Sequence, residues 1–304
     1  MRGLEPGGDR ALRGALTALI TPFREDGEVD VGALASLVAW QVESGIDGLV
    51  PCGTTGEGAT LRPDEQERVI ATVVEAAQGR VPVVAGCGSN DTGRTVESAR
   101  RAAAAGADAL LVVTPYYNKP NRSGMIAHYR AVCEQAGLPV VVYNVPGRTG
   151  QNLGAEMILR LAEVPGIAGV KEASGNLEQI AAVIEARRPG FAVLSGDDAL
   201  GLPTVALGAE GLISVVSNEA PAEVSEMIAR ALAGEMARAR EIHYRLLPLM
   251  RANFVETNPV PVKSAMEVLG RARGDVRAPL GPPEAATVVA IRAALARAGL
   301  EGRP

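Results

Sequence analysis

The regular alternation of short apolar runs with helical patterns constrains the fold of this chain more than any other feature. Eight apolar runs typical of buried strands occur between residues 14 and 215, and helical patterns separate each run from the next. Strands that are apolar throughout are covered on both faces, which favours a parallel sheet. The runs are residues 14–20, 48–52, 81–86, 109–113, 138–143, 166–170, 191–195 and 211–215.

Eight strands are the number that a closed (β/α)8 barrel requires. The step from helix to strand also repeats, as Gly-x-Asp/Glu-x-Leu at residues 45–49, 106–110 and 208–212. A doubly wound open sheet would show the same alternation, but no Gly-x-Gly-x-x-Gly turn follows the first strand and the polar clusters follow several different strands. We therefore predict an α/β fold, with a TIM barrel over residues 14–232.

The two ends of the chain have a different character. Strand patterns stop near residue 233, and the helical periodicity that continues predicts a C-terminal helical extension, a domain of residues 233–304. Residues 1–13 are polar and rich in glycine, which predicts a disordered N-terminal arm. No apolar stretch approaches the roughly 20 residues of a membrane span. We expect a cytoplasmic protein without a membrane partner.

Composition argues against several classes of protein. The formal net charge of −5 gives no basic surface for nucleic acid. The three cysteines, Cys52, Cys87 and Cys133, are widely spaced in apolar surroundings, which predicts buried thiols instead of a disulfide framework or a zinc site. Only His128 and His243 are available as imidazole ligands, so we expect no metal centre.

A lysine stands where the apolar run 166–170 meets a polar turn. Lys171 is one of only three lysines, with Lys119 and Lys263, so it is not readily explained as random surface charge. Burial disfavours the ammonium form and lowers the pKa, which leaves a neutral amine able to attack a ketone and form a Schiff base. The alternative is a strand-end lysine whose ammonium reaches a surface carboxylate.

In a barrel, the carboxyl ends of all strands open on one face, so residues that follow different strands form one site. They include an amine nucleophile, phenols and hydroxyls that can pass protons, and an arginine that can grip a carboxylate at two points. The candidate carboxylate bases are Glu57, Glu172 and Asp197. The other strand-end residues are Thr54, Thr55, Tyr116, Tyr117, Tyr143, Arg148, Lys171, Ser195, Gly196, Ile213 and Ser214.

Each of these features has a plainer interpretation when taken alone. The turn at residues 53–56 is also compatible with a phosphate cradle or a simple turn, and Tyr143 with a core tyrosine. Arg148 would serve equally in a surface ion pair, and Tyr116 with Tyr117 in interface packing. Their convergence on one predicted face favours a functional site.

Several motifs together resemble those of the dihydrodipicolinate synthase and N-acetylneuraminate lyase family. The resemblance runs from about residue 14 to about residue 300, and the synthase branch is the closer match because of the double threonine and the arginine. The motifs are GTTGE at 53–57, TPYYN at 114–118, YNVPGRTG at 143–150, GVKEASGN at 169–176, SGDD at 195–198 and FVETNP at 254–259.

The resemblance implies that Lys171 forms a covalent imine with pyruvate, without any cofactor, while Thr55 and nearby amides hold the pyruvate carboxylate. Arg148 would bind the carboxylate of the second substrate, L-aspartate 4-semialdehyde. Gly196 and Ile213 would line the pocket with main-chain groups. The product would be 4-hydroxy-tetrahydrodipicolinate, on the route to lysine and diaminopimelate.

The resemblance also implies a proton relay of Tyr143, Thr54 and Tyr117. In the family the last of these reaches into the site of a neighbouring subunit, so a homotetramer, a dimer of dimers, is expected.

Other functions remain open at this point. Another pyruvate-dependent lyase or dehydratase of the family, acting on a sugar acid, would share the imine chemistry but generally lacks Arg148. A non-catalytic pyruvate-binding barrel would have no need of Lys171 or Tyr143. A phosphate-binding barrel would carry a Gly-rich turn after the last strands, where this chain has Ser217-Asn218-Glu219.

We predict weak or absent feedback inhibition by lysine. The positions that match the effector site of lysine-inhibited relatives are Gly58, Pro63, Gln66, Asn90 and Arg94. Arg94 stands in place of a glutamate and repels the ammonium of the effector. A lysine titration of the activity checks this, and strong inhibition at sub-millimolar lysine, an order-of-magnitude benchmark, contradicts it.

Overall fold

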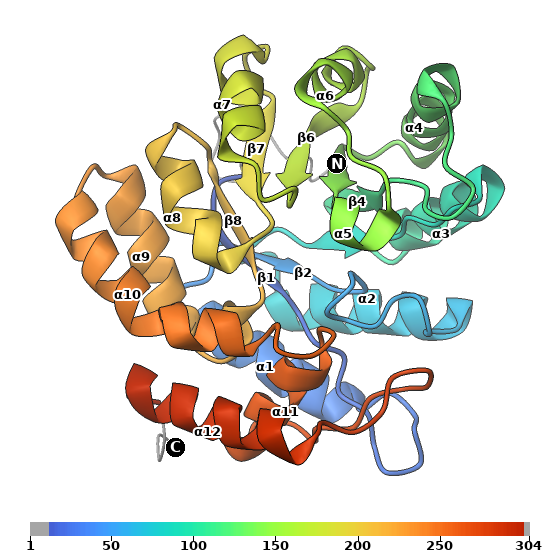
Figure 1. The fold of residues 1–304 in the computed structure, drawn as a ribbon. Coiled ribbons are helices and arrows are strands. Elements are labelled where there is room, and N and C mark those ends of the chain that lie inside the picture. Colours follow the sequence, from blue (N-terminus) through green and yellow to red (C-terminus); the bar gives the residue numbers. More distant parts are fainter. Residues whose placement is uncertain (1–11, 301–304) are drawn as a thin grey trace.

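The computed structural model describes residues 12–300, and in them eight parallel strands form a barrel surrounded by helices (Figure 1). The predicted TIM barrel with a helical C-terminal part is therefore confirmed. Residues 1–11 of the predicted arm lie outside the described residues. The strands are β1 Gly14–Ala18, β2 Gly48–Val50, β3 Val84–Gly86, β4 Ala109–Val113, β5 Val140–Asn144, β6 Ile167–Glu172, β7 Ala192–Ser195 and β8 Gly211–Ser214.

The strand order is β2-β1-β8-β7-β6-β5-β4-β3, so closure depends on the contact between β2 and β3. That contact is a parallel bridge from Leu49 to Val83. The amide of Leu49 donates to the carbonyl of Pro82 at 3.0 Å, and the amide of Gly86 donates to that of Pro51 at 2.9 Å. Both prolines contribute only their carbonyls, because proline has no N–H to extend the ladder.

Helices follow the strands as the sequence pattern predicts. Asp30 caps α1 by accepting a hydrogen bond from the amide of Ala33 at 2.9 Å, and Pro63 is the first residue of α2. Around the barrel lie α1 Val31–Glu43, α2 Pro63–Ala77, α3 Thr92–Ala104, α4 Arg122–Ala136, α5 Pro146–Thr149, α6 Ala155–Ala162, α7 Leu177–Ala186, α8 Asp198–Ala206, the short 3-10 helix η1 Val216–Asn218 and α9 Pro221–Leu232.

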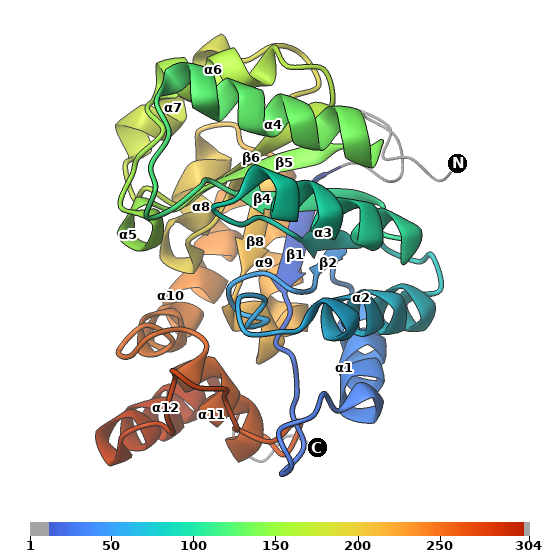
Figure 2. The ribbon, with the colours of Figure 1, turned by 90° about the vertical axis from the view of Figure 1, so that its right-hand side faces the viewer.

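The C-terminal part consists of α10 Met236–Ala252, α11 Val260–Val268 and α12 Ala285–Ala298, gathered on one side of the barrel (Figures 1 and 2). Its apolar side chains join the core between strands and helices, as Leu246 and Leu295 do, while Val262 and Met266 pack with Leu37 of α1. The C-terminal helices thus share a core with the barrel. The domain boundary at residue 232 stays a prediction.

A second core fills the interior of the barrel. It contains alternate residues of the strands, including Leu16, Leu111, Tyr143, Leu194 and Ile213. Because successive strand residues point to opposite faces, the remaining strand residues pack outwards against the helices. No helix in the described part of the chain is long and apolar enough to cross a membrane.

The three cysteines are buried free thiols, as predicted. Burial raises the pKa of the Cys87 thiol to about 12 and that of Cys133 to about 11. These thiols are therefore protonated and unreactive near neutral pH.

One local prediction needs adjustment. The sixth strand does not end at Lys171 but includes Glu172, because the backbones of both residues pair with β5 and β7. Residues 146–149, directly after β5, form the single helical turn α5, which starts at Pro146 and is capped by Gly150 in the left-handed conformation.

A buried ion pair fixes the C-terminal part to the barrel. Lys263 of α11 is fully buried and donates from Nζ to Oε1 of Glu57 at 2.6 Å. The ammonium also lies 4.1 Å from the centre of the Phe23 ring. Burial lowers the pKa of Lys263 in spite of Glu57. Glu57 directly follows the turn of residues 53–56 after β2, so this pair reaches a segment of the predicted site.

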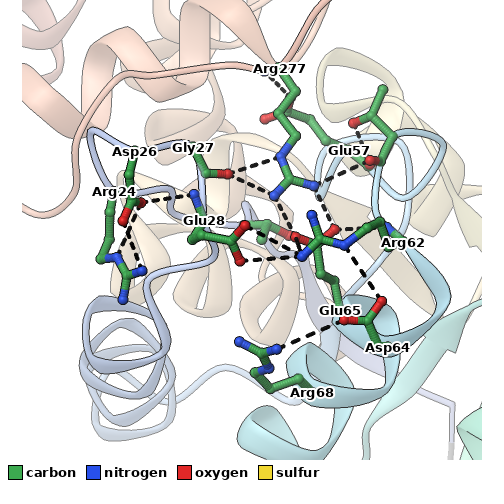
Figure 3. Close-up of polar contacts among 12 residues, drawn as sticks. Arg24, Asp26, Gly27, Glu28, Glu57, Arg62, Asp64, Glu65, Arg68 and Arg277 are labelled. Atoms are coloured by element: carbon green, nitrogen blue, oxygen red, sulfur yellow. Dashed lines mark hydrogen bonds and ion pairs between the residues drawn. The ribbon is translucent and has the colours of Figure 1, made fainter.

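Arg277 makes a second connection between the same parts (Figure 3). Its backbone amide donates to Oε2 of Glu57 at 2.9 Å, and its guanidinium binds both carboxylate oxygens of Glu65, each at 2.6 Å. It also donates to the carbonyl of Gly27 at 2.7 Å. The hydrogen bond from Arg277 lowers the pKa of Glu65. The segment after α11 is thereby attached to the start of α2.

Replacement of Lys263 by methionine tests the buried pair. Lys263→Met leaves the Glu57 carboxylate buried without its cation, so we expect the free energy of unfolding to fall by about 3–5 kcal/mol. Adding Glu57→Gln should restore part of this loss. Urea unfolding of both variants measures the effect. Lys119→Met, at an exposed lysine, is the control and should change stability by less than about 0.5 kcal/mol. Equal stability of Lys263→Met and the control contradicts this account.

Candidate active site

Lys171 lies inside the barrel beside Tyr143. The parallel register aligns Lys171 with Tyr143 of β5 and Leu194 of β7, and both neighbours belong to the interior core. Aligned residues share a face of the sheet, so the lysine side chain is directed to the interior. It is 5% exposed, and its Nζ lies 4.4 Å from the centre of the Tyr143 ring. Lys171 and Tyr143, both predicted as site residues, are therefore in contact in the structure.

Gly196 and Ile213 border the same place. A Cβ atom on Gly196 would lie 3.0 Å from Cε of Lys171 and 2.8 Å from Cβ of Ala173, so only glycine leaves the lysine stem where it is. The amide of Gly196 donates to the carbonyl of Glu172 at 2.7 Å. Ile213 is fully buried in the interior core that includes Tyr143.

The turn after β2 presents its two threonines differently. Thr55 is buried, whereas Thr54 is partly exposed. The turn is flanked by Cys52 at φ 57° and Glu57 at φ 52°, two residues in the left-handed region that disfavours side chains other than glycine. Such strain persists only where surrounding contacts hold the backbone, and here Glu57 is held by Lys263.

Arg148 lies in α5, directly after β5, and is exposed in the single chain. Its Nη2 donates to the carbonyl of Asn258 at 3.2 Å. The side-chain amide of Asn258 in turn donates from Nδ2 to Oγ1 of Thr55 at 3.0 Å. One residue from the segment between α10 and α11 thus links Arg148 to the threonine turn.

Tyr117 is placed apart from the other predicted residues. It follows β4, is 90% exposed, and has a φ of 65°, again in the left-handed region. Within the described residues of one chain, no contact joins its side chain to Lys171 or Tyr143. The exposed aromatic ring is therefore accessible from outside its own chain.

The three candidate carboxylates are all engaged in structural contacts. Glu57 pairs with Lys263. Glu172 accepts hydrogen bonds from the amide of Ser174 at 2.6 Å and from side-chain amides of Asn144 and Gln179. Asp197 caps α8 by accepting from the amide of Ala199 at 2.9 Å. Phenol and hydroxyl groups are therefore better placed than these carboxylates to move protons at Lys171.

The end of β8 carries an acid instead of a phosphate cradle. Glu219 is buried, accepts a hydrogen bond from Asn253 at 2.8 Å, and has a pKa raised well above its usual value by burial. An anion bound there would meet a carboxyl group. This arrangement argues against a phosphate-binding barrel.

A separate cavity of about 900 Å³ opens at the amino ends of β5, β6 and β7, the opposite end of the barrel from the carboxyl ends that carry the site. Its described lining includes Pro139, Ile167, Arg188 and Ala192 and contains no lysine. Because this cavity lacks an amine nucleophile, the carboxyl ends of the strands, where Lys171 lies, remain the candidate active site.

Sequence reasoning missed two residues of this region. In the sequence, Lys263 stands out only as one of three lysines, and Asn258 only as part of the motif 254–259. With only three lysines in the chain, each one is a candidate for a specific role, and a lysine is almost never fully buried unless it is paired. The scarcity of lysine therefore could have drawn attention to Lys263. The contact of Asn258 with Thr55 spans 203 residues and depends on the fold.

Comparisons with known proteins agree with this geometry. The model of the Dihydrodipicolinate synthetase family matches residues 11–298. A relative from Maridesulfovibrio salexigens, named 4-hydroxy-tetrahydrodipicolinate synthase, is 52% identical over 290 residues, which cover 95% of this chain and 99% of the relative.

Two solved structures are similar throughout. The chloride-inhibited dihydrodipicolinate synthase from Acinetobacter baumannii complexed with pyruvate has a TM-score of 0.93 and 41% identity, covering 95% of this chain and all of that one (100%). The enzyme from Cyanidioschyzon merolae with lysine bound has a TM-score of 0.91 and 43% identity, covering 95% and 98%. The resemblance seen in the motifs is confirmed, and the chain belongs to the dihydrodipicolinate synthetase family.

Proposed function

We propose that this chain catalyses the condensation of pyruvate with L-aspartate 4-semialdehyde to 4-hydroxy-tetrahydrodipicolinate, the reaction of its named relatives. The observation that carries the proposal is the buried Lys171 beside Tyr143, with Gly196 against the lysine stem. A lysine amine that faces the barrel interior is the group that attacks a ketone to form a Schiff base.

In the first half of the reaction, the Lys171 amine attacks the keto carbon of pyruvate and water leaves, forming the imine. Thr55 holds the pyruvate carboxylate with its hydroxyl. Loss of a methyl proton then gives an enamine. Tyr143 and Thr54 carry protons in these steps, because the nearby carboxylates are engaged elsewhere. No cofactor takes part.

In the second half, the enamine carbon attacks the aldehyde carbon of the second substrate and a C–C bond forms. The amine of that substrate then attacks the imine carbon, which closes the ring and releases the Lys171 amine. Arg148 binds the carboxylate of the semialdehyde, for which its planar guanidinium supplies parallel N–H donors. Gly196 and Ile213 shape the pocket.

A sugar-acid lyase of the same family is the second candidate. Arg148 argues against it, because its guanidinium, held by Asn258, is suited to a carboxylate and not to sugar hydroxyls. A pyruvate-binding barrel without catalysis is disfavoured by the joint presence of Lys171 and Tyr143. We place the reaction in the cytoplasm, since buried free thiols fit a reducing compartment.

The choice of second substrate is tested by the rate of pyruvate consumption with L-aspartate 4-semialdehyde and with sugar aldehydes. We expect turnover with the semialdehyde, and a fall of about 100-fold in kcat/KM in Arg148→Ala from lost charge-assisted hydrogen bonds. Arg160→Ala, at an exposed arginine paired with Glu156, is the matched control and should retain activity.

Borohydride trapping of pyruvate separates the two halves of the proposal. The adduct should form on wild type and be absent in Lys171→Ala. If an adduct forms on Lys171 but the semialdehyde does not react, the imine chemistry stands and the second substrate is wrong.

We further propose that Tyr117 completes the proton relay of a neighbouring subunit, so that an oligomer, expected to be a homotetramer, is the active form. Its 90% exposure in the single chain supports this assignment. A phenol that points away from its own barrel is poorly placed to exchange protons at Lys171 of its own chain, but it is accessible to a second copy of the chain.

Mixing two inactive variants tests the exchange of Tyr117. Tyr117→Ala retains Lys171, and Lys171→Ala retains Tyr117, so a hybrid dimer has one complete site if the tyrosine acts in the neighbour. After co-refolding, we expect recovery of about a quarter of wild-type activity from statistical pairing. If Tyr117 acts within its own chain, no chain carries both residues and the mixture stays inactive.

A further inference from the structure

Asn258 contacts both residues to which we assign a substrate carboxylate. It lies between α10 and α11, far from the barrel strands in sequence, and is 4% exposed. Its side-chain Nδ2 donates to Oγ1 of Thr55 at 3.0 Å, and its backbone carbonyl accepts from Nη2 of Arg148 at 3.2 Å. The side chain of Asn258 therefore contacts the residue assigned to pyruvate, and its backbone contacts the residue assigned to the semialdehyde.

The direction of the side-chain bond determines what Thr55 can offer. A hydroxyl has one hydrogen to donate, and an amide NH2 group can only donate. When Asn258 donates to Oγ1, the hydrogen of Thr55 remains free for a carboxylate. An acceptor in place of the amide nitrogen would take that hydrogen and leave only lone pairs facing the anion.

The backbone contact orients the guanidinium and leaves most of its N–H donors available. Arg148 has five N–H donors, and the carbonyl of Asn258 occupies one of them. The other donors remain for a planar carboxylate. Since Arg148 is exposed, this bond limits the positions that its long side chain samples.

The segment that carries Asn258 is itself anchored beside the threonine turn. The amide of Lys263 donates to the carbonyl of Pro259 at 3.0 Å, and the Lys263 ammonium binds Glu57, two residues after Thr55. The turn and the segment are thus joined at two points. This double attachment gives the Asn258 amide a defined place relative to Thr55.

We infer that Asn258 is a positioning residue that keeps the Thr55 hydroxyl a hydrogen-bond donor to the pyruvate carboxylate and orients Arg148 through its backbone carbonyl. The inference rests on the proposed function and deepens it. It assigns to the C-terminal part a role in recognition of the first substrate that acts through Thr55.

The test replaces the donor by an acceptor of the same shape. Asn258→Asp takes the hydrogen of Thr55 and adds negative charge near the pyruvate carboxylate, so we expect the pyruvate KM to rise about 10-fold or more. The semialdehyde KM should stay within about twofold, because the backbone carbonyl is unchanged. Asn258→Ala, which leaves Thr55 free to rotate, should raise the pyruvate KM by a smaller factor.

Two further measurements separate positioning from general loss of structure. The pyruvate concentration that gives half-maximal borohydride trapping on Lys171 should rise with KM in Asn258→Asp. Asn253→Asp is the matched control: Asn253 is also buried in the C-terminal part, but its amide donates to Glu219. Its pyruvate dependence should stay that of wild type, and melting temperatures of all variants show any loss of stability.

The inference is overturned if Asn258→Asp traps pyruvate at wild-type concentrations, if both KM values rise equally, or if Asn253→Asp gives the same change. Trapping also keeps the two proposals apart. If wild type traps pyruvate but does not use the semialdehyde, the proposed second substrate is wrong, while the trapping curve of Asn258→Asp still decides the role of Asn258. If wild type traps no pyruvate, both proposals are overturned.

Discussion

Closure of the parallel sheet is the constraint on which the rest of this structure depends. The bridge from Leu49 to Val83 joins the two ends of the strand order and turns an open sheet into a barrel. Only in a closed barrel do β2, β5, β6 and β8 place their carboxyl ends around one opening. Thr55, Tyr143 and Lys171 come from different strands, and closure makes them parts of one site.

The C-terminal helices are more than a cover for the barrel. They share its core, and they reach the site through Lys263 on Glu57 and Asn258 on Thr55 and Arg148. A buried ammonium is costly unless it is paired, so the ion pair makes the position of α11 depend on the turn after β2. The same contacts hold that turn in its strained backbone conformation.

Departures from local rules coincide with the proposed chemistry. Among the described residues other than glycine, Cys52, Glu57, Gln78 and Tyr117 occupy the left-handed region; Gln78 caps α2, and the other three lie in segments that follow β2 or β4. Lys171 is a charged residue in a strand buried on both faces. Each departure is opposed by local energetics and is maintained by tertiary contacts, which is characteristic of functional sites.

The sequence by itself determined the barrel and most of the candidate site. Apolar periodicity predicted all eight strands, and the rule that the carboxyl ends of barrel strands share one face predicted one site for Lys171, Tyr143 and Gly196. These features depend on residues close in sequence or on a general property of barrels.

Tertiary structure alone decided the end of β6, which is set by pairing with β5 and β7, and the partners of Glu57 and Thr55. Lys263 and Asn258 lie about 200 residues from those partners, 206 and 203 respectively. No local pattern records such contacts, because they form only when the C-terminal helices pack against the closed barrel.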